Sequence, residues 1–390
     1  MIMEVPLSAR AVTCGVAAAL AVLSLSACTN AHPAARRPAA TRPDATGGPL
    51  AIGVAPGTRA KPASCQSPPR RSDQFHARRV TAGWRKVTPD SPSGFFSQGN
   101  VSADGSLLTV QDPGGIGEVR RLTGDTLEPV PTPWPGKSLG LAAGGERLWV
   151  LTGAGQQKYG LGSRQAGTWY GGPLTPASGG ADVDGRGPWV MAGDRTMRWD
   201  GRAWRQAPLP DFGASLTGTA RAPWVVLDED ARAPLAQWTG RAWRLVRVPG
   251  VKGKWVQLSA VAPTRPGEFW ALGMVTWDED DAELEPLARS RLLALRWKAG
   301  RWSCLFGPTD EEGNARFTDA VHDGRGGLWA VTHDGELWHL TDGRWTRERP
   351  REARHVMNPD MVREEITELA ASEDGRHVYA LGRAVWRLGR

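Results

Sequence analysis

The sequence predicts an all-β fold built from repeated four-stranded sheets, and three observations lead to that prediction. The 390 residues include 48 Gly and 30 Pro, so turn-forming residues are plentiful. A hairpin of the form Trp–turn–Gly–Arg–Trp recurs as RWDGRAW at 198–204, QWTGRAW at 237–243 and RWKAGRW at 296–302. A short apolar strand, such as PWVVLD at 223–228, recurs ahead of these hairpins.

Each repeat contains four predicted strands. Turns such as Asp184–Gly185 and Asp323–Gly324 precede the apolar strand, because Gly accepts the positive φ that a tight turn needs. Pro ends the last strand, as in AWRQAPLP at 203–210, and Pro is tolerated at a sheet edge. The units recur roughly every 40 to 60 residues, which is typical of a β-propeller with four-stranded blades. We expect the many Trp side chains to pack between blades.

The number of blades and the closure of the ring follow from the repeats and from the two ends of the domain. Seven apolar strands of this type predict a seven-bladed propeller; they begin at residues 107, 148, 188, 223, 269, 328 and 378. The sequence ends with AVWRLGR at 384–390, a third strand without a fourth. TAGWRKVTPD at 81–90 has the pattern of a fourth strand, so we expect it to complete the last blade and close the ring.

The segment DGRGGLWAVTHDGELWHLTDGRW at 323–345 resembles the repeat of bacterial two-component-regulator propellers. The resemblance covers one strong unit and several weaker ones. It implies the propeller fold and carries no function, because the repeat is a structural unit found in many settings.

The N-terminal residues 1–27 are interpreted as a lipoprotein signal peptide. Arg10 is followed by an uncharged run, 11–27, whose length fits a signal peptide and is short for a membrane span. The run ends in Leu25–Ser26–Ala27 followed by Cys28, which resembles the lipobox of bacterial lipoproteins and implies lipid attachment at Cys28. The alternative is an ordinary secretory signal cleaved after Ala27. With the lipid, we expect the protein on the outer face of the cytoplasmic membrane, extracytoplasmic and lipid-anchored.

Residues 28–79 are predicted to be a disordered basic tether rich in Pro, Ala and Arg, and residues 80–390 to be the propeller domain. The tether has eight Arg and one Lys against two Asp, which equals the net charge of +7 of the whole chain. A basic segment beside a lipid anchor suits anionic lipid or wall polymer as a partner, and export argues against nucleic acid.

Two cysteines remain beyond the signal segment and the lipid site. Disulfides persist in an extracytoplasmic compartment, so Cys65 and Cys304 are candidates for a bond that attaches the end of the tether to the domain. The alternative is two unpaired thiols.

Two predicted loops on adjacent blades are acidic, LDEDAR at 227–232 and TWDEDDAELE at 276–285. Several carboxylates from two loops of one face suit a hard cation such as calcium, although the spacing of a dedicated calcium loop is missing. The alternatives are solvated loops or a docking patch for a basic partner, including the tether itself. The candidate residues are Asp228, Glu229, Asp230, Asp278, Glu279, Asp280 and Asp281.

The sequence contains no Ser–His–Asp, Cys–His or phosphate-loop motif that would predict catalysis. We therefore expect a monomeric, non-enzymatic binding or scaffold protein of the cell envelope, with an envelope protein or polymer as partner and no cofactor beyond the open question of calcium. His333 and His339 are interpreted as structural or surface residues. The alternative function is a propeller-type glycan hydrolase or lyase with acids on the loop-bearing face.

Overall fold

The computed structural model describes residues 64–66 and 73–389 apart from internal gaps, of which the longest are 132–136, 154–158, 174–182, 280–286 and 351–356. The predicted signal peptide at 1–27, the predicted lipid site Cys28 and most of the expected tether lie outside the described residues. In the described part of the chain, no helix is long and apolar enough to cross a membrane.

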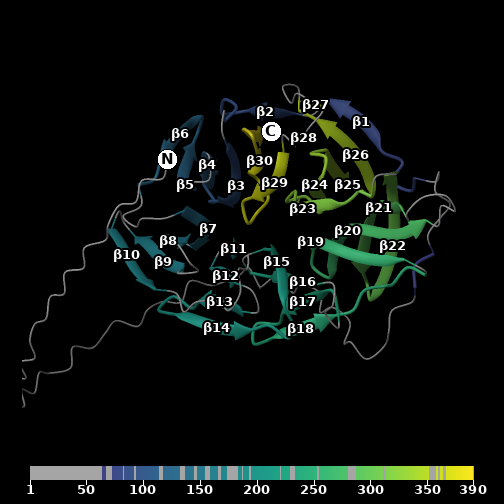
Figure 1. The fold of residues 1–390 in the computed structure, drawn as a ribbon, viewed down its shortest axis with the longest axis horizontal. Helices are drawn as coiled ribbons and strands as arrows, with labels where there is room; N and C mark the ends of the chain where they lie inside the picture. The colour runs from purple at the N-terminus through teal and green to yellow at the C-terminus, as the bar shows by residue number, and fades with distance from the viewer. Residues whose placement is uncertain are drawn as a thin grey trace, which may run out of the picture. The chain divides into compact units, whose positions relative to one another are not determined.

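The described strands form six four-stranded sheets, one five-stranded sheet and one short hairpin. The sheets follow one another around a ring, and the first strand of each sheet lies nearest the centre (Figure 1). The first three sheets contain β3 (Gly94–Val101), β4 (Leu107–Pro113), β5 (Glu118–Thr123) and β6 (Thr126–Pro129); β7 (Lys137–Gly144), β8 (Arg147–Gly153), β9 (Tyr159–Gln165) and β10 (Thr168–Pro173); and β11 (Val183–Arg186), β12 (Trp189–Ala192), β13 (Arg195–Trp199) and β14 (Trp204–Pro208).

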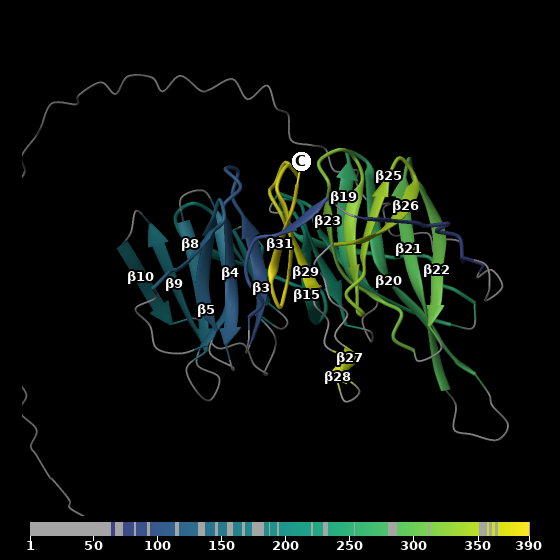
Figure 2. The same cartoon turned by 90° about the horizontal axis from the view of Figure 1, so that it is seen from above.

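The remaining sheets complete the ring, and Figure 2 shows them edge-on, with a hairpin projecting from one face. They contain β15 (Gly213–Gly218), β16 (Pro223–Leu227), β17 (Leu235–Trp238) and β18 (Trp243–Val246); β19 (Trp255–Arg265), β20 (Glu268–Glu279), β21 (Leu287–Lys298) and β22 (Arg301–Asp310); β23 (Phe317–His322), β24 (Leu328–Thr332), β25 (Leu337–Thr341), β26 (Arg344–Arg349) and β1 (Arg78–Thr81); and β29 (Ile366–Ala371), β30 (Val378–Gly382), β31 (Val385–Leu388) and β2 (Trp84–Lys86). The projecting hairpin is β27 (Met357–Asn358) and β28 (Met361–Val362).

The all-β propeller with four-stranded blades is confirmed, whereas the predicted seven four-stranded blades are not. Six sheets have four strands, and the sheet that begins with β23 has five. The difference arises because β1 adds to the outer edge of β26 in parallel, with Arg78 opposite Thr346 and Thr81 opposite Arg349. The segment that contributes this extra strand was expected to belong to the tether.

Residues upstream of the predicted boundary at residue 80 also pack on the domain. Phe75 is only 3% exposed and stacks on Trp345, with ring centroids 4.4 Å apart. The backbone amide of Gln74 donates to the Phe306 carbonyl at 2.8 Å. A Cβ on Gly307 would lie 2.6 Å from the Phe75 ring, so the glycine makes room for that ring.

A disulfide joins Cys65 to Cys304 on β22, with Cα atoms 6.1 Å apart. The Cys65 amide also donates to the Gly250 carbonyl at 2.8 Å, and Cys65 forms a parallel bridge with Val251. The described residues between Cys65 and Lys86 thus lie at the outer edges of three consecutive sheets. We call residues 64–86 the strap.

The strap ends in the strand that closes the ring, as the sequence predicted. β2 pairs antiparallel with β31, with Trp84 opposite Leu388 and Lys86 opposite Trp386. Trp84 is 5% exposed and meets Trp329 of the preceding sheet edge-on, with centroids 5.0 Å apart. The expected packing of aromatic side chains between sheets is seen again where Trp224 of β16 contacts Phe269 of β20 at 4.5 Å.

Substituting Trp84→Ala should lower the free energy of unfolding by about 3–5 kcal/mol, because it empties a buried aromatic site in the closing strand. Urea denaturation followed by circular dichroism measures this change. Trp255→Ala is the matched control, because Trp255 is 63% exposed. Its cost should stay within about 0.5 kcal/mol. Equal losses for the two variants would contradict the role given to β2.

Candidate functional site

Six of the seven described strands nearest the axis contain a β-bulge that was not predicted from the sequence, whereas β11 pairs with β12 in regular register. Among the described sheets, the register of the first strand shifts at Ser97/Asn100, Ser138/Gly140, Gly213/Ser215, Leu258/Ala260, Phe317/Asp319 and Ile366/Glu368. A bulge re-aims the side chains around it. The hydroxyl of Ser259 donates to the Phe317 carbonyl of the next sheet, and that of Ser215 donates to the Ser259 carbonyl at 3.1 Å.

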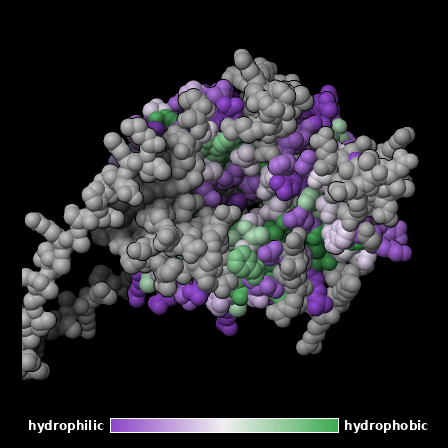
Figure 3. All heavy atoms as spheres, viewed as in Figure 1, coloured by the Kyte–Doolittle hydropathy of each residue, from purple (hydrophilic) through white to green (hydrophobic). Residues whose placement is uncertain are grey.

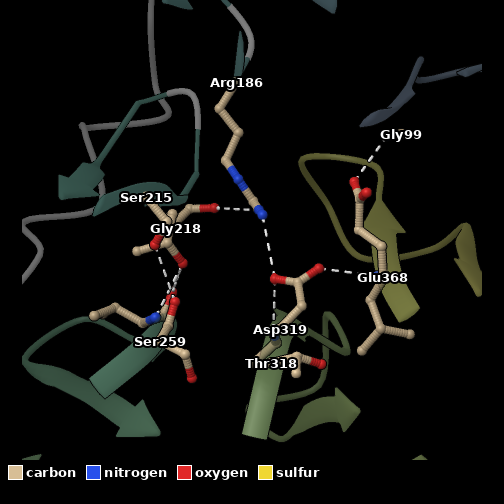
Figure 4. Close-up of polar contacts among 12 residues, drawn as sticks. Gly99, Arg186, Ser215, Gly218, Ser259, Thr318, Asp319 and Glu368 are labelled. Atoms are coloured by element: carbon tan, nitrogen blue, oxygen red, sulfur yellow. Dashed lines mark hydrogen bonds and ion pairs between the residues drawn. The ribbon is translucent and has the colours of Figure 1, made fainter. Parts of the chain in front are cut away.

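An ion pair crosses the centre of the ring. Arg186 of β11 reaches Asp319 of β23, with Nη2 and Oδ1 3.3 Å apart, and its Nη1 donates to the Gly218 carbonyl at 3.2 Å (Figure 4). Asp319 is buried, and its Oδ2 accepts the Leu369 amide at 2.9 Å. This carboxylate therefore connects three sheets.

A second carboxylate of the inner strands, Glu368, accepts the amides of Gln98 and Gly99 at 2.8 and 3.0 Å. Gln98 has a φ of 57°, and this left-handed conformation turns both amides toward the carboxylate. A Cβ on Gly99 would lie 2.4 Å from Ala370, so the site needs glycine. The backbone concavity that could hold an anion is thus filled by the chain's own side chain.

His339, interpreted from sequence as structural or surface, is two residues downstream of the β25 start and lies between two carboxylates. Its Nε2 is 3.1 Å from Asp323 Oδ2, its Nδ1 is 3.5 Å from Glu348 Oε1, and its ring stacks on Trp329. Burial acts to lower the pKa of His339, but the hydrogen bonds to the two carboxylates outweigh it and the pKa is raised. His333 lies apart, with its Nδ1 3.2 Å from Arg316 Nη2.

Of the acidic residues proposed as a cation or partner site, the structure describes only part. Asp228 follows β16, is exposed, and its amide donates to the Phe212 carbonyl at 3.0 Å. Asp278 and Glu279 end β20, while Glu229, Asp230, Asp280 and Asp281 lie outside the described residues. Within the described ranges, no three His, Cys, Asp or Glu residues are grouped to hold a metal, so calcium binding stays a prediction.

Two exposed aromatic residues near Asp228 were missed by the sequence analysis. Phe212 is 42% exposed and Trp255 is 63% exposed, and they are the exposed large apolar side chains of the described residues. Phe212 immediately precedes the inner strand β15, and Trp255 is the first residue of the inner strand β19. Ser215 bonds to Ser259 and Thr217 to Val261, both 44 residues apart, so β15 and β19 run side by side in the same direction. Phe212 and Trp255 therefore lie at the same face of the ring.

A cavity of about 230 Å³ lies between the β15–β18 and β19–β22 sheets at this face. It is lined by Ala214, Leu227, Asp228, Pro234, Val248–Gly250 and Val256–Leu258. Figure 3 shows apolar residues gathered over β15 and β16 beside a hydrophilic ring centre. We call Phe212, Trp255, Asp228 and this cavity the aromatic rim. The signal that could have found it is Trp255 itself, which departs from the repeat by starting an inner strand.

Substituting Asp319→Ala should destabilise the protein by about 2–4 kcal/mol, because the buried Leu369 amide and the Arg186 guanidinium both lose a partner. Arg186→Ala should cost less, because Asp319 keeps its backbone donors. Urea denaturation of both variants and of the double variant measures the coupling. A double variant that loses the sum of the single effects would contradict a direct interaction.

The stability contributed by His339 should depend on pH. Because its pKa is raised in the folded state, this contribution is complete below the ordinary pKa of 6.5 and disappears as pH rises through the folded-state value. The difference in unfolding free energy between the parent and His339→Gln should therefore shrink as the pH rises above the ordinary pKa of 6.5. The exposed His76→Gln is the control. A difference that is constant over this range would contradict the assignment.

No protein-family model matches the chain, and no curated protein matches it. Solved structures match its fold. A catalytically inactive His-to-Ala variant of virginiamycin B lyase from Staphylococcus aureus, with quinupristin, is similar with a TM-score of 0.55, 14% identity and coverage of 78% of this chain and 98% of that one. YCF48 bound to D1 peptide gives a TM-score of 0.54, 13% identity and coverage of 80% and 97%. The extracellular domain of a putative hybrid two-component system from B. thetaiotaomicron gives a TM-score of 0.51, 13% identity and coverage of 79% and 39%. At these identities, the likeness establishes the all-β propeller fold alone.

Proposed function

We propose that this chain is a non-enzymatic binding protein of the cell envelope that takes an extended, basic segment of a partner protein on its aromatic rim. The observation that carries the proposal is the exposure of Trp255 and Phe212 beside a cavity that Asp228 lines. Large exposed aromatic side chains are enriched at binding surfaces, and extended Pro-rich peptides dock into aromatic-lined grooves. Carboxylates at the groove favour Lys and Arg in the ligand.

The acidic sequence at the end of β20 supports a basic ligand. Trp255 pairs with Thr276 across β19 and β20, so Asp278 lies two residues beyond that partner, toward the same face. The stretch from 276 to 285 contains six acidic residues and no basic one. Negative charge of this kind raises the rate of encounter with a basic partner.

The rigid centre of the ring supports binding over catalysis. Arg186, Asp319 and Glu368 are held by backbone groups and by one another on neighbouring sheets. YCF48, which shares the fold, is bound to a peptide, which supports peptide capture by a ring of this kind. A hydrolase or lyase is the second candidate, favoured by the lyase among the fold neighbours.

We also propose that the five-stranded sheet serves as the seventh blade, since β23–β26 have the same order as the other blades and β1 is an addition.

We further propose that Cys28 carries a lipid and that the propeller lies outside the cytoplasmic membrane. The lipobox-like residues 25–28 support this proposal. An extracellular domain among the fold neighbours is consistent with that location.

A fluorescent peptide of Pro-Pro-Arg repeats should bind the full chain, and Trp255→Ala should weaken the binding about tenfold, because it removes the principal aromatic contact. Fluorescence anisotropy measures both affinities. Asp228→Asn should weaken binding less, and its effect should diminish as salt is added.

Glu373→Gln is the matched charge control. Glu373 pairs with Arg221 at 2.7 Å, in a turn that follows an inner strand and so lies on the opposite face. The Glu373→Gln substitution should leave the affinity for the peptide unchanged. Binding that is equally strong in the parent and in Trp255→Ala would overturn the proposed function.

A further inference from the structure

We propose that the aromatic rim has a built-in ligand, residues 56–63 of the same chain, with the sequence PGTRAKPA. The inference rests on the proposed peptide-binding role of the rim and adds its regulation: a partner must displace this segment before it can bind. Four observations support the assignment: the point where the chain enters the fold, its direction there, its reach, and its chemistry.

The chain enters the described fold beside the cavity. Cys65 forms a bridge with Val251, and its amide donates to Gly250, a residue that lines the cavity. The disulfide to Cys304 holds this point covalently. Residues upstream of Cys65 therefore start within the immediate surroundings of the aromatic rim.

The direction of the chain at this point is set by the parallel bridge. In parallel pairing, residues that precede Cys65 run alongside residues that precede Val251. Those residues are Pro249 and Val248, and both line the cavity. Continuation of this parallel pairing upstream of Cys65 would direct the segment along the cavity wall.

The reach is short. Val251 also bridges Lys254, the residue before Trp255. Two interstrand spacings amount to about 10 Å. An extended Pro-rich segment advances about 3.1 Å per residue, so about three or four residues cover that distance. Lys61 and Arg59 lie four and six residues before Cys65, so both are far enough upstream to reach Trp255.

The chemistry of the segment matches that of the rim. Pro56 and Pro62 favour an extended conformation suited to an aromatic surface. Arg59 and Lys61 carry the charge that the carboxylate of Asp228 attracts. Because the segment is tethered a few residues away, its effective concentration is in the millimolar range, so a weak local affinity is enough to occupy the rim.

Hydroxyl-radical footprinting of Trp255 in the full chain tests the proposal, with mass spectrometry as the readout. The charge-reversal variant Arg59→Glu/Lys61→Glu should label Trp255 at least about twice as fast as the parent, because half-occupancy of the rim by the tethered segment halves the labelling. Arg36→Glu/Arg37→Glu is the matched control, because it makes the same charge change far from Cys65 in the sequence. Trp255 should be labelled in this variant at the same rate as in the parent. The same charge-reversal variant should bind the Pro-Pro-Arg peptide more tightly than the parent.

Equal labelling of Trp255 in the parent and in both variants would overturn the inference. If the peptide still bound in a Trp255-dependent manner, the proposed function would stand without the built-in ligand. Protection of Trp255 from labelling that disappears when the protein is diluted would also overturn the inference, because a second copy of the chain would then be covering the rim. If the Pro-Pro-Arg peptide did not bind but the protection of Trp255 still depended on Arg59 and Lys61, the result would count against the proposed partner and not against the built-in ligand.

Discussion

The pairing of β2 with β31 is the contact on which the packing of the other sheets depends, because it closes the consecutive sheets into a ring. Each sheet buries its two faces only against its neighbours, so an open row would expose the faces of its first and last members. Trp84 fills the last of these interfaces by packing on Trp329. The closing strand comes from the N-terminal side and its partner from the C-terminal end, so this contact forms only once the whole domain has been synthesised. Such non-local pairing is slow compared with local hairpins.

The repeat was predictable because its signals are local. The Asp323–Gly324 turn, in which Gly324 has a φ of 71°, was predicted correctly, and TAGWRKVTPD carries the pattern of the strand that it becomes in part. The prediction of a turn at Asp184–Gly185 was wrong, because both residues pair within β11. The strap was missed because it has no such pattern: Phe75 is a single large apolar residue in a basic, Pro-rich stretch, and RRVT pairs with β26 along a sheet edge that only the folded ring provides. Arg186 could not be chosen from the sequence among many arginines, since its partner Asp319 is 133 residues away. The acidic loops were noted from composition, whereas the exposure of Trp255 depends on where β19 begins.

The centre and the face of the ring have different physical roles. At the centre, the carboxylates of Asp319 and Glu368 replace missing ladder bonds at bulges and connect one sheet to the next. Buried polar groups with complete hydrogen bonding make a structure rigid. At the face, Phe212 and Trp255 stand at the ends of two strands that side-chain hydrogen bonds from Ser215 and Thr217 hold in register. A rigid support lowers the entropy lost when a flexible ligand is captured there.

The strap also determines how the domain would respond to a mechanical load. Tension on the chain upstream of residue 64 meets the disulfide at Cys65 before it reaches β1 or β2. The covalent bond passes that tension to β22, which lies within an intact four-stranded sheet, and the three-residue closing strand downstream carries none of it. A reducing environment would remove this protection, and the same tension would then peel the strap from its N-terminal end toward the strand that closes the ring.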